Sequence, residues 1–264
     1  MTDTLADPSL ERLCELAARD QWRLEELDWS AVDVSMLPVE FRQIAADAFA
    51  QLHWGEQTAH VAATRLREWL PEGPARAFLA TQQVDEARHV AFFERIIHLF
   101  GCEGRVRPSV QRLMREVREA DTPEALMLGM QLLIEGVAHS MFLEASRRVQ
   151  TLDDTEGLDS SLRALKTLVA EAMPRLARDE SRHIAFGLHV LRRRIPRLER
   201  AARVRLEEKV ALWGEWVLEQ AREPDLVVGI GVDGEALCAR LIDDLNLRIS
   251  QVGLDTRLAP LRAA

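Results

Sequence analysis

Two copies of a Glu-x-x-His motif, at residues 86–89 and 180–183, restrict the fold of this chain more than any other feature. Each copy lies in a long segment with apolar residues at helical spacing, and residues i and i+3 share one face of a helix. Each motif therefore presents a carboxylate and an imidazole to the same point. The helical segment before each motif adds one glutamate on its apolar face. The six side chains are Glu56, Glu86, His89, Glu135, Glu180 and His183.

Proline, glycine and capping residues divide the chain into helical segments, and alternation typical of strands is nearly absent. We therefore predict a single all-α domain over residues 1–264, with a four-helix bundle at about 38–195. Its long helices are expected over about 38–70, 74–100, 122–149 and 160–195, with a kink or break at Pro174. Extra helices are expected over about 8–26, 197–222 and 234–251. The remaining parts are predicted to be a linker at 27–37, a polar connection at 151–159, a turn region at 224–231 and a loose tail beyond 253.

The composition excludes several classes of function. A net charge of −9 over 264 residues argues against general attraction to nucleic acid or to anionic lipid. Cys14, Cys102 and Cys238 are too scattered for a disulfide framework or a zinc site. No stretch reads as a secretory signal or as apolar enough to span a bilayer. We therefore expect a cytoplasmic protein with no nucleic-acid or membrane partner.

The four glutamates and two histidines suit a site for two metal ions. A single Glu-x-x-His on a charged helix is usually part of a solvated face. Here both copies lie in apolar stripes, where unpaired ionised carboxylates would be very costly to bury. Two divalent cations would neutralise four carboxylates. Mixed oxygen and imidazole ligation suits iron or manganese better than calcium or magnesium, and two such motifs plus two glutamates are the ligand set of di-metal four-helix bundles.

An aspartate precedes the glutamate of each motif, and an arginine precedes each histidine. Metal-bound histidines usually donate their second N–H to a carboxylate. We predict that Asp85 and Asp179 accept this bond, each from the histidine of the opposite motif, and that Arg88 and Arg182 hold the aspartates. Surface salt bridges are the alternative.

Three further side chains are candidates for lining a substrate pocket: His60, His139 and Phe142. The two histidines follow Glu56 and Glu135 by one helical turn and could also supply a proton or an extra ligand. A hydrogen-bonded core histidine is the alternative for each. Other apolar candidates, which at helical spacing are more often plain core, are Met127, Met130, Met141 and Phe186.

The sequences Asp-Glu-Ala-Arg-His and Asp-Glu-Ser-Arg-His resemble the paired metal motifs of the ferritin-like superfamily. They are most similar to the branch that holds ribonucleotide reductase small subunits, ligand-binding oxidases and multicomponent monooxygenases. The resemblance covers about residues 40–195. It implies a ferritin-like bundle and carries the six side chains over as ligands of a non-haem di-iron or manganese/iron centre that reacts with O2.

The sequence also departs from several members of this superfamily. It has no tyrosine, which excludes a tyrosyl radical and a valine–tyrosine crosslink. Three scattered cysteines cannot form the four-cysteine iron site of rubrerythrin-like peroxidases. The arylamine N-oxygenases carry an additional histidine ligand one turn before the last Glu-x-x-His. That position is Leu176 here, so the sequence predicts no close relation to them.

The resemblance implies an oxygenase or oxidase that uses O2 to oxidise a small, at least partly apolar organic substrate. No flavin motif or glycine-rich nucleotide loop is present, so a separate electron donor, or the substrate itself, would supply the electrons. A homodimer is compatible with the class. The alternatives are an iron- or manganese-handling protein of the ferroxidase type, a scaffold that binds metal only for stability, and a radical-generating subunit without a tyrosine.

Overall fold

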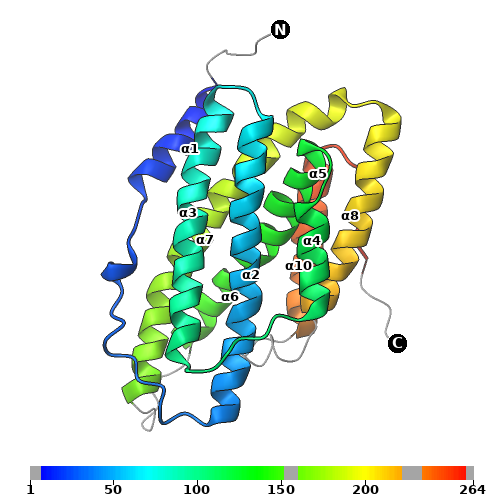
Figure 1. Ribbon diagram of the computed structural model, residues 1–264. Helices are drawn as coiled ribbons and strands as arrows, with labels where there is room; N and C mark the ends of the chain where they lie inside the picture. Colours follow the sequence, from blue (N-terminus) through cyan, green and yellow to red (C-terminus); the bar gives the residue numbers. More distant parts are fainter. Residues whose placement is uncertain (1–6, 152–159, 222–233, 260–264) are drawn as a thin grey trace.

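The computed structural model describes residues 7–151, 160–221 and 234–259, and every regular element among them is a helix (Figure 1). Two helix pairs form the bundle. Helix α2 (Val39–Trp69) packs along α3 (Pro74–Leu99), and α6 (Glu135–Thr151) packs along α7 (Ser160–Arg194). The predicted all-α class is confirmed.

The third bundle helix is composite. Helix α5 (Pro123–Met127), a π-helical segment (Leu128–Ile134) and α6 follow one another without a break. A π-helix shifts the backbone hydrogen bonds by one residue, and such segments are frequent at functional sites. Arg248 donates to the Leu132 carbonyl oxygen at 3.5 Å, and a side chain at Gly136 would collide with its guanidinium. The π-helical segment and this contact were not predicted.

The other helices cover the bundle on two sides. Helix α1 lies against α3 and α7, whereas α4, α8 and α10 lie against the π-helical segment and its neighbours. The covering elements are α1 (Pro8–Arg19), the 3₁₀ turns Leu24–Glu26 and Ile195–Arg197, α4 (Pro108–Arg118), α8 (Arg200–Ala221) and α10 (Gly234–Gln251).

Helix α4 was missed by the sequence analysis, although its pattern is visible. Proline occupies its first position, where a missing N–H costs nothing. Its buried residues recur at helical spacing, and they are Val110, Leu113, Met114 and Val117. The short length of the helix hid this periodicity among charged neighbours.

The structure differs in detail from three other expectations. Helix α1 ends at Arg19 instead of residue 26, because the chain turns so that Gln21 and Trp22 reach into the bundle. Helix α7 continues through Pro174, so the break considered there is absent, while a kink stays a prediction. Part of the supposed loose tail is packed: Leu258 is buried, and its backbone N–H and C=O both bond the Asn246 side chain. The expected turn region at 224–231 and all but the first residue of the 151–159 connection lie outside the described residues.

The apolar core falls into two clusters at opposite ends of the bundle. One contains the segment of α2 after Glu56, the start of α3 and the end of α7. The other contains the start of α2, the end of α3 and the first half of α7. Since neighbouring helices run in opposite directions, the six predicted ligands occupy the layer between the clusters.

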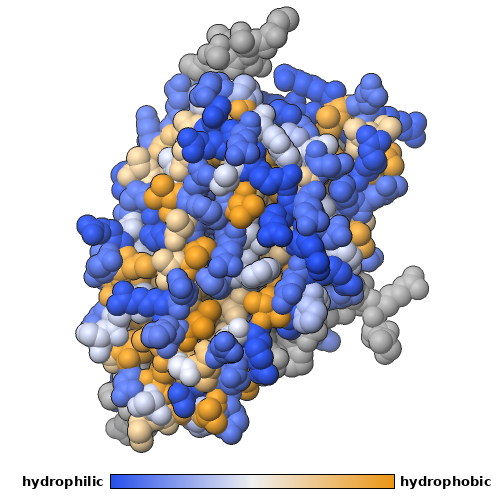
Figure 2. Space-filling model, viewed as in Figure 1, coloured by the Kyte–Doolittle hydropathy of each residue, from blue (hydrophilic) through white to orange (hydrophobic). Residues whose placement is uncertain are grey.

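The segment Pro123–Val149 is long and apolar enough to cross a membrane, contrary to the expectation that no stretch would be. However, 72% of its most apolar stretch is buried inside the bundle. Burial of this segment in the core of the bundle therefore accounts for its apolar composition. On the face shown in Figure 2, hydrophilic side chains predominate and apolar ones lie between them in separate spots.

Candidate metal centre

The six side chains predicted from the two motifs come together in the middle of the bundle. They form two groups, and within each group the ligating atoms lie within 4.8 Å of one another. Glu86 belongs to both groups, so its carboxylate lies between two potential metal positions. The first group is Glu56, Glu86, His89 and Glu180, and the second is Glu86, Glu135 and His183.

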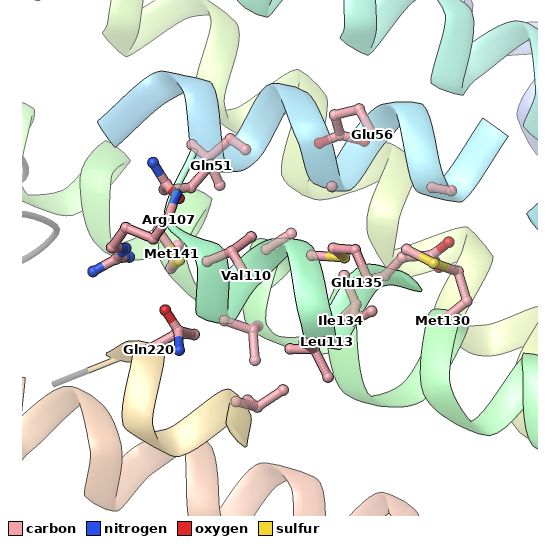
Figure 3. Close-up of a pocket in the computed structure, with 17 residues that line it drawn as sticks. Gln51, Glu56, Arg107, Val110, Leu113, Met130, Ile134, Glu135, Met141 and Gln220 are labelled. Atoms are coloured by element: carbon pink, nitrogen blue, oxygen red, sulfur yellow. The ribbon is translucent and has the colours of Figure 1, made fainter. Parts of the chain in front are cut away.

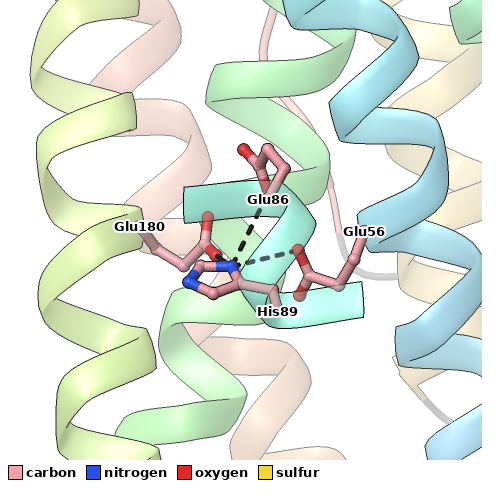
Figure 4. A group of neighbouring side chains, drawn as sticks. All are labelled: Glu56, Glu86, His89 and Glu180. Atoms are coloured by element: carbon pink, nitrogen blue, oxygen red, sulfur yellow. Dashed lines mark hydrogen bonds and ion pairs between the residues drawn. The ribbon is translucent and has the colours of Figure 1, made fainter. Parts of the chain in front are cut away.

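Each imidazole turns its Nδ1 atom toward the carboxylates. His89 Nδ1 lies 3.1 Å from Glu180, 3.3 Å from Glu56 and 3.6 Å from Glu86. Dashed lines in Figure 4 join His89 to these three glutamates. His183 Nδ1 lies 3.2 Å from Glu86, 3.5 Å from Glu180 and 3.9 Å from Glu135. The i, i+3 spacing within each helix places glutamate and histidine side by side. Packing of the four helices supplies the other contacts.

Several ligating atoms in this layer are buried and lack a hydrogen-bond partner. They are Glu86 Oε2, Glu135 Oε2, both oxygens of Glu180 and His183 Nδ1. Buried polar atoms of native proteins are almost always paired. Five unpaired lone-pair donors within one cluster therefore fit a bound cation, and the mixture of carboxylate oxygen and imidazole nitrogen fits iron or manganese.

The ionisation of these groups is strongly perturbed in the metal-free chain. Burial, followed by the charge of Glu180, raises the pKa of Glu56 to about 8. Burial also raises the pKa of Glu135 well above its ordinary value. Burial opposes protonation of His89, but the charge of Glu56 and further carboxylates raise its pKa well above the usual value. The metal-free cluster thus retains protons that two metal ions would displace.

The aspartates face the histidines of the opposite motifs. Asp179 Oδ2 lies 3.2 Å from His89 Nε2, and Asp85 Oδ2 lies 3.4 Å from His183 Nε2. This is the crossed arrangement that the sequence analysis describes. Burial opposes ionisation of Asp85, but the hydrogen bond and charge of His183 lower its pKa to about 2. Both aspartates therefore remain carboxylate acceptors at neutral pH.

The arginines of the motifs join the two aspartates. Arg88 donates to Asp85 at 2.5 Å and to Asp179 at 2.9 Å. Arg182 donates to Asp179 at 2.6 Å and to Asp85 at 3.2 Å. The positive charges of the buried Arg182 and the partly buried Arg88 thus offset the two buried aspartates, and the four glutamates are left for cations to neutralise.

Sequence reasoning missed three polar side chains that complete this network. Trp22 donates its indole N–H to Asp179 at 2.8 Å, and Gln21 donates to Asp85 at 3.0 Å. Both belong to a segment far from the motifs in sequence. Gln82, fully buried, donates to Glu86 and Glu135. Its position four residues before Glu86, on the same helical face, was the available signal.

An apolar cavity of about 90 Å³ reaches the metal layer, and Glu56 and Glu135 form part of its wall. Figure 3 shows these glutamates toward one end and Gln51, Arg107 and Gln220 toward the other. Apolar side chains from α2, α4, the π-helical segment, α6 and α8 line the rest. Met130 and Met141 are among them, as considered from the sequence.

The three candidate pocket residues are not among the residues that line this cavity. His60 directs Nδ1 to the carbonyl oxygen of Gln83 at 3.2 Å, on the α3 side of its helix. His139 is half-buried near Arg248. Phe142 stacks on Phe93 at a centroid distance of 5.9 Å within the apolar core.

A family model described as p-aminobenzoate N-oxygenase AurF matches residues 64–244. The chain belongs to this family. The match includes both Glu-x-x-His motifs and Glu135. The expectation of no close relation to arylamine N-oxygenases was therefore wrong, although residue 176 is a fully buried leucine instead of a histidine. No curated protein matches the sequence.

Solved structures of R2-like ligand-binding oxidase share the fold. A variant with an aerobically reconstituted Mn/Fe cofactor has a TM-score of 0.63 and 21% identity, over 93% of this chain and 94% of that one. A second structure, with its metal cofactor after photoconversion, has a TM-score of 0.64, 21% identity and 93% coverage of both chains. The chain is thus an O2-dependent oxidoreductase with a ferritin-like fold, as the resemblance predicts.

Proposed function

We propose that Glu56, Glu86, His89, Glu135, Glu180 and His183 bind two iron ions, or one manganese and one iron. The convergence of these six side chains and their unpaired buried atoms carry the proposal. When bound, the two ions supply the activation of O2. Glu86, which belongs to both groups, would help to hold both ions.

The chain's own residues would prepare this site in three ways. Asp85 and Asp179 fix the imidazole rings through Nε2, so that Nδ1 faces the metal positions. Arg88 and Arg182 keep the aspartates charged and in place. The two apolar clusters on either side of the layer limit the access of water.

We propose that the substrate is a small, at least partly apolar organic molecule bound in the cavity that ends at Glu56 and Glu135. The family description names p-aminobenzoate as substrate and nitrogen as the oxidised atom. An apolar wall for a ring and polar residues toward the far end would suit such a molecule. Arylamines are therefore the first class to test. The cavity also favours an organic substrate over the ferroxidase alternative.

We further propose that the electrons come from a separate donor and that the protein works in the cytoplasm, alone or as a homodimer. The absence of a nucleotide or flavin motif in the sequence supports a separate donor.

The decisive experiment loads the chain with iron under anaerobic conditions, measures metal content, and follows the optical spectrum after rapid mixing with O2. Product analysis with p-aminobenzoate and its analogues follows. About two irons per chain, an O2-dependent transient band and an N-oxygenated product are expected. Two irons that end as released ferric mineral would favour the ferroxidase alternative, and a chain that binds no metal would refute the ligand assignment.

A further inference from the structure

The two halves of the metal layer differ at one pair of equivalent positions. The residue four before the motif glutamate is Gln82 in α3 and Leu176 in α7. Both side chains are fully buried. At this spacing each lies one turn from its glutamate, on the same helical face. One half therefore has a primary amide beside its carboxylate, and the other has an apolar side chain.

The amide of Gln82 joins two of the proposed ligands from different helices. Its Nε2 donates to Glu86 Oε1 at 2.9 Å and to Glu135 Oε1 at 2.8 Å. The second oxygen of each carboxylate is left without a hydrogen-bond partner. The two N–H bonds thus occupy Oε1 of Glu86 and of Glu135, and they leave Oε2 of each carboxyl group free to bind a metal ion.

These two glutamates, with His183, make up the second of the two ligand groups. In the first group, neither Glu56 nor Glu180 receives a hydrogen bond from this amide; their nearest partner is the imidazole of His89. Both glutamates that Gln82 contacts therefore belong to the group that contains His183. Glu86 is also a member of the other group, but Gln82 contacts no other residue of that group.

We propose that Gln82 is a positioning residue that makes the two metal positions unequal, by orienting Glu86 and Glu135 toward the position beside His183. The inference rests on the proposed ligand assignment. Without the amide, the two hydrogen bonds that link the Glu135 carboxyl group to Glu86 through one side chain would be lost. The position beside His89 keeps Glu56, Glu180 and its imidazole, none of which accepts a hydrogen bond from Gln82.

The test compares Gln82→Met, which removes both donors at similar size, with Leu176→Met at the equivalent position. Anaerobic titrations with Fe(II) and with Mn(II), followed by calorimetry and by Mn(II) electron paramagnetic resonance, resolve the two binding events. Gln82→Met should weaken one event about 10–100-fold and leave the other unchanged, a loss in the range found for groups that support ligands. Leu176→Met should leave both unchanged.

The weakened event is assigned by removing one histidine at a time. In a His89→Gln background, Gln82→Met should reduce the remaining affinity further. In a His183→Gln background it should have no additional effect. A merely structural role would weaken both positions alike. Should Gln82→Met fail to fold by circular dichroism, Gln82→Glu serves instead, because a carboxyl group can donate at most one of the two bonds.

Two outcomes would overturn the inference separately from the proposed function. If the unaltered chain binds two ions and Gln82→Met binds them with the same two affinities, Gln82 does not set the inequality. If Gln82→Met weakens both events equally, the amide supports the whole layer and not one position. A chain that binds no metal before any substitution would refute the proposed function itself, and this inference with it.

Discussion

Replacement of Asp179 by asparagine tests the link between the buried charges and the ligand geometry. Asp179 is fully buried and accepts from four groups: Trp22 at 2.8 Å, Arg88 at 2.9 Å and His89 at 3.2 Å on Oδ2, and Arg182 at 2.6 Å on Oδ1. An asparagine keeps the shape but has only one acceptor oxygen. If that oxygen serves the three donors on the Oδ2 side, the amide N–H₂ group must face Arg182.

The expected loss of unfolding free energy follows from an N–H₂ group that faces the Arg182 guanidinium. Breaking a buried ion pair by removing one partner costs about 3–5 kcal/mol. Arg182 keeps Asp85 at 3.2 Å, so we expect the lower limit, about 3 kcal/mol of unfolding free energy for the metal-free chain. Because His89 loses its charged acceptor, the metal position beside it should bind about 10–100-fold more weakly.

Denaturant unfolding and anaerobic metal titration measure the two effects. The matched control is Glu15→Gln, which removes a solvent-exposed partner of Arg12 and should cost about 0–1 kcal/mol. An Asp179→Asn chain as stable as the Glu15→Gln control, with unchanged metal affinity, would show that the buried network neither stabilises the bundle nor orients His89.

Three other predictions concern the same layer. Glu86→Ala or His183→Ala should remove metal and O2 reactivity while circular dichroism stays unchanged; normal metal content in both would refute the assignment. The raised pKa of Glu56, about 8, means that the folded, metal-free chain binds this proton more tightly than the unfolded chain. Its stability should therefore fall from pH 5 to pH 8, and metal affinity should rise over that range; a thermal midpoint independent of pH would contradict this. Gly55 lines the cavity, and an added Cβ would meet only Met114, at 3.6 Å. Gly55→Ala should raise the free energy of unfolding by about 0.5–1 kcal/mol. Gly55→Phe should abolish substrate turnover while metal content is retained. Equal turnover in the two variants would exclude this cavity as the substrate site.

Local sequence patterns account for the helices and for the ligand set. The spacing of Glu86 and His89 within one turn works in any α-helix, whatever packs around it. Thr122 and Pro123 likewise mark a helix start through purely local chemistry, and the structure has the Thr122 side chain accepting from the Ala125 N–H. Such features depend only on neighbours along the chain.

Sequence patterns say less where a side chain has to be placed relative to another helix. His60 and His139 follow Glu56 and Glu135 by four residues, yet neither lines the cavity. Four residues turn an α-helix by more than a full circle, so the side chain is displaced around the axis, and packing decides which neighbour it meets. Helix periodicity alone cannot assign a residue to one of two adjacent faces.

The sequence by itself determined the all-α class and most of the helix-forming segments, and it singled out the six residues that are proposed to bind two metal ions. Only the tertiary structure decided that Trp22 and Gln21 leave α1 to bond the aspartates, that Gln82 joins Glu86 to Glu135, and that a cavity ends at the metal layer. The physical reason is the distance along the chain over which the interactions act. Helical spacing is fixed by bonds within a few residues, whereas these contacts join segments up to 157 residues apart and exist only once the helices have packed.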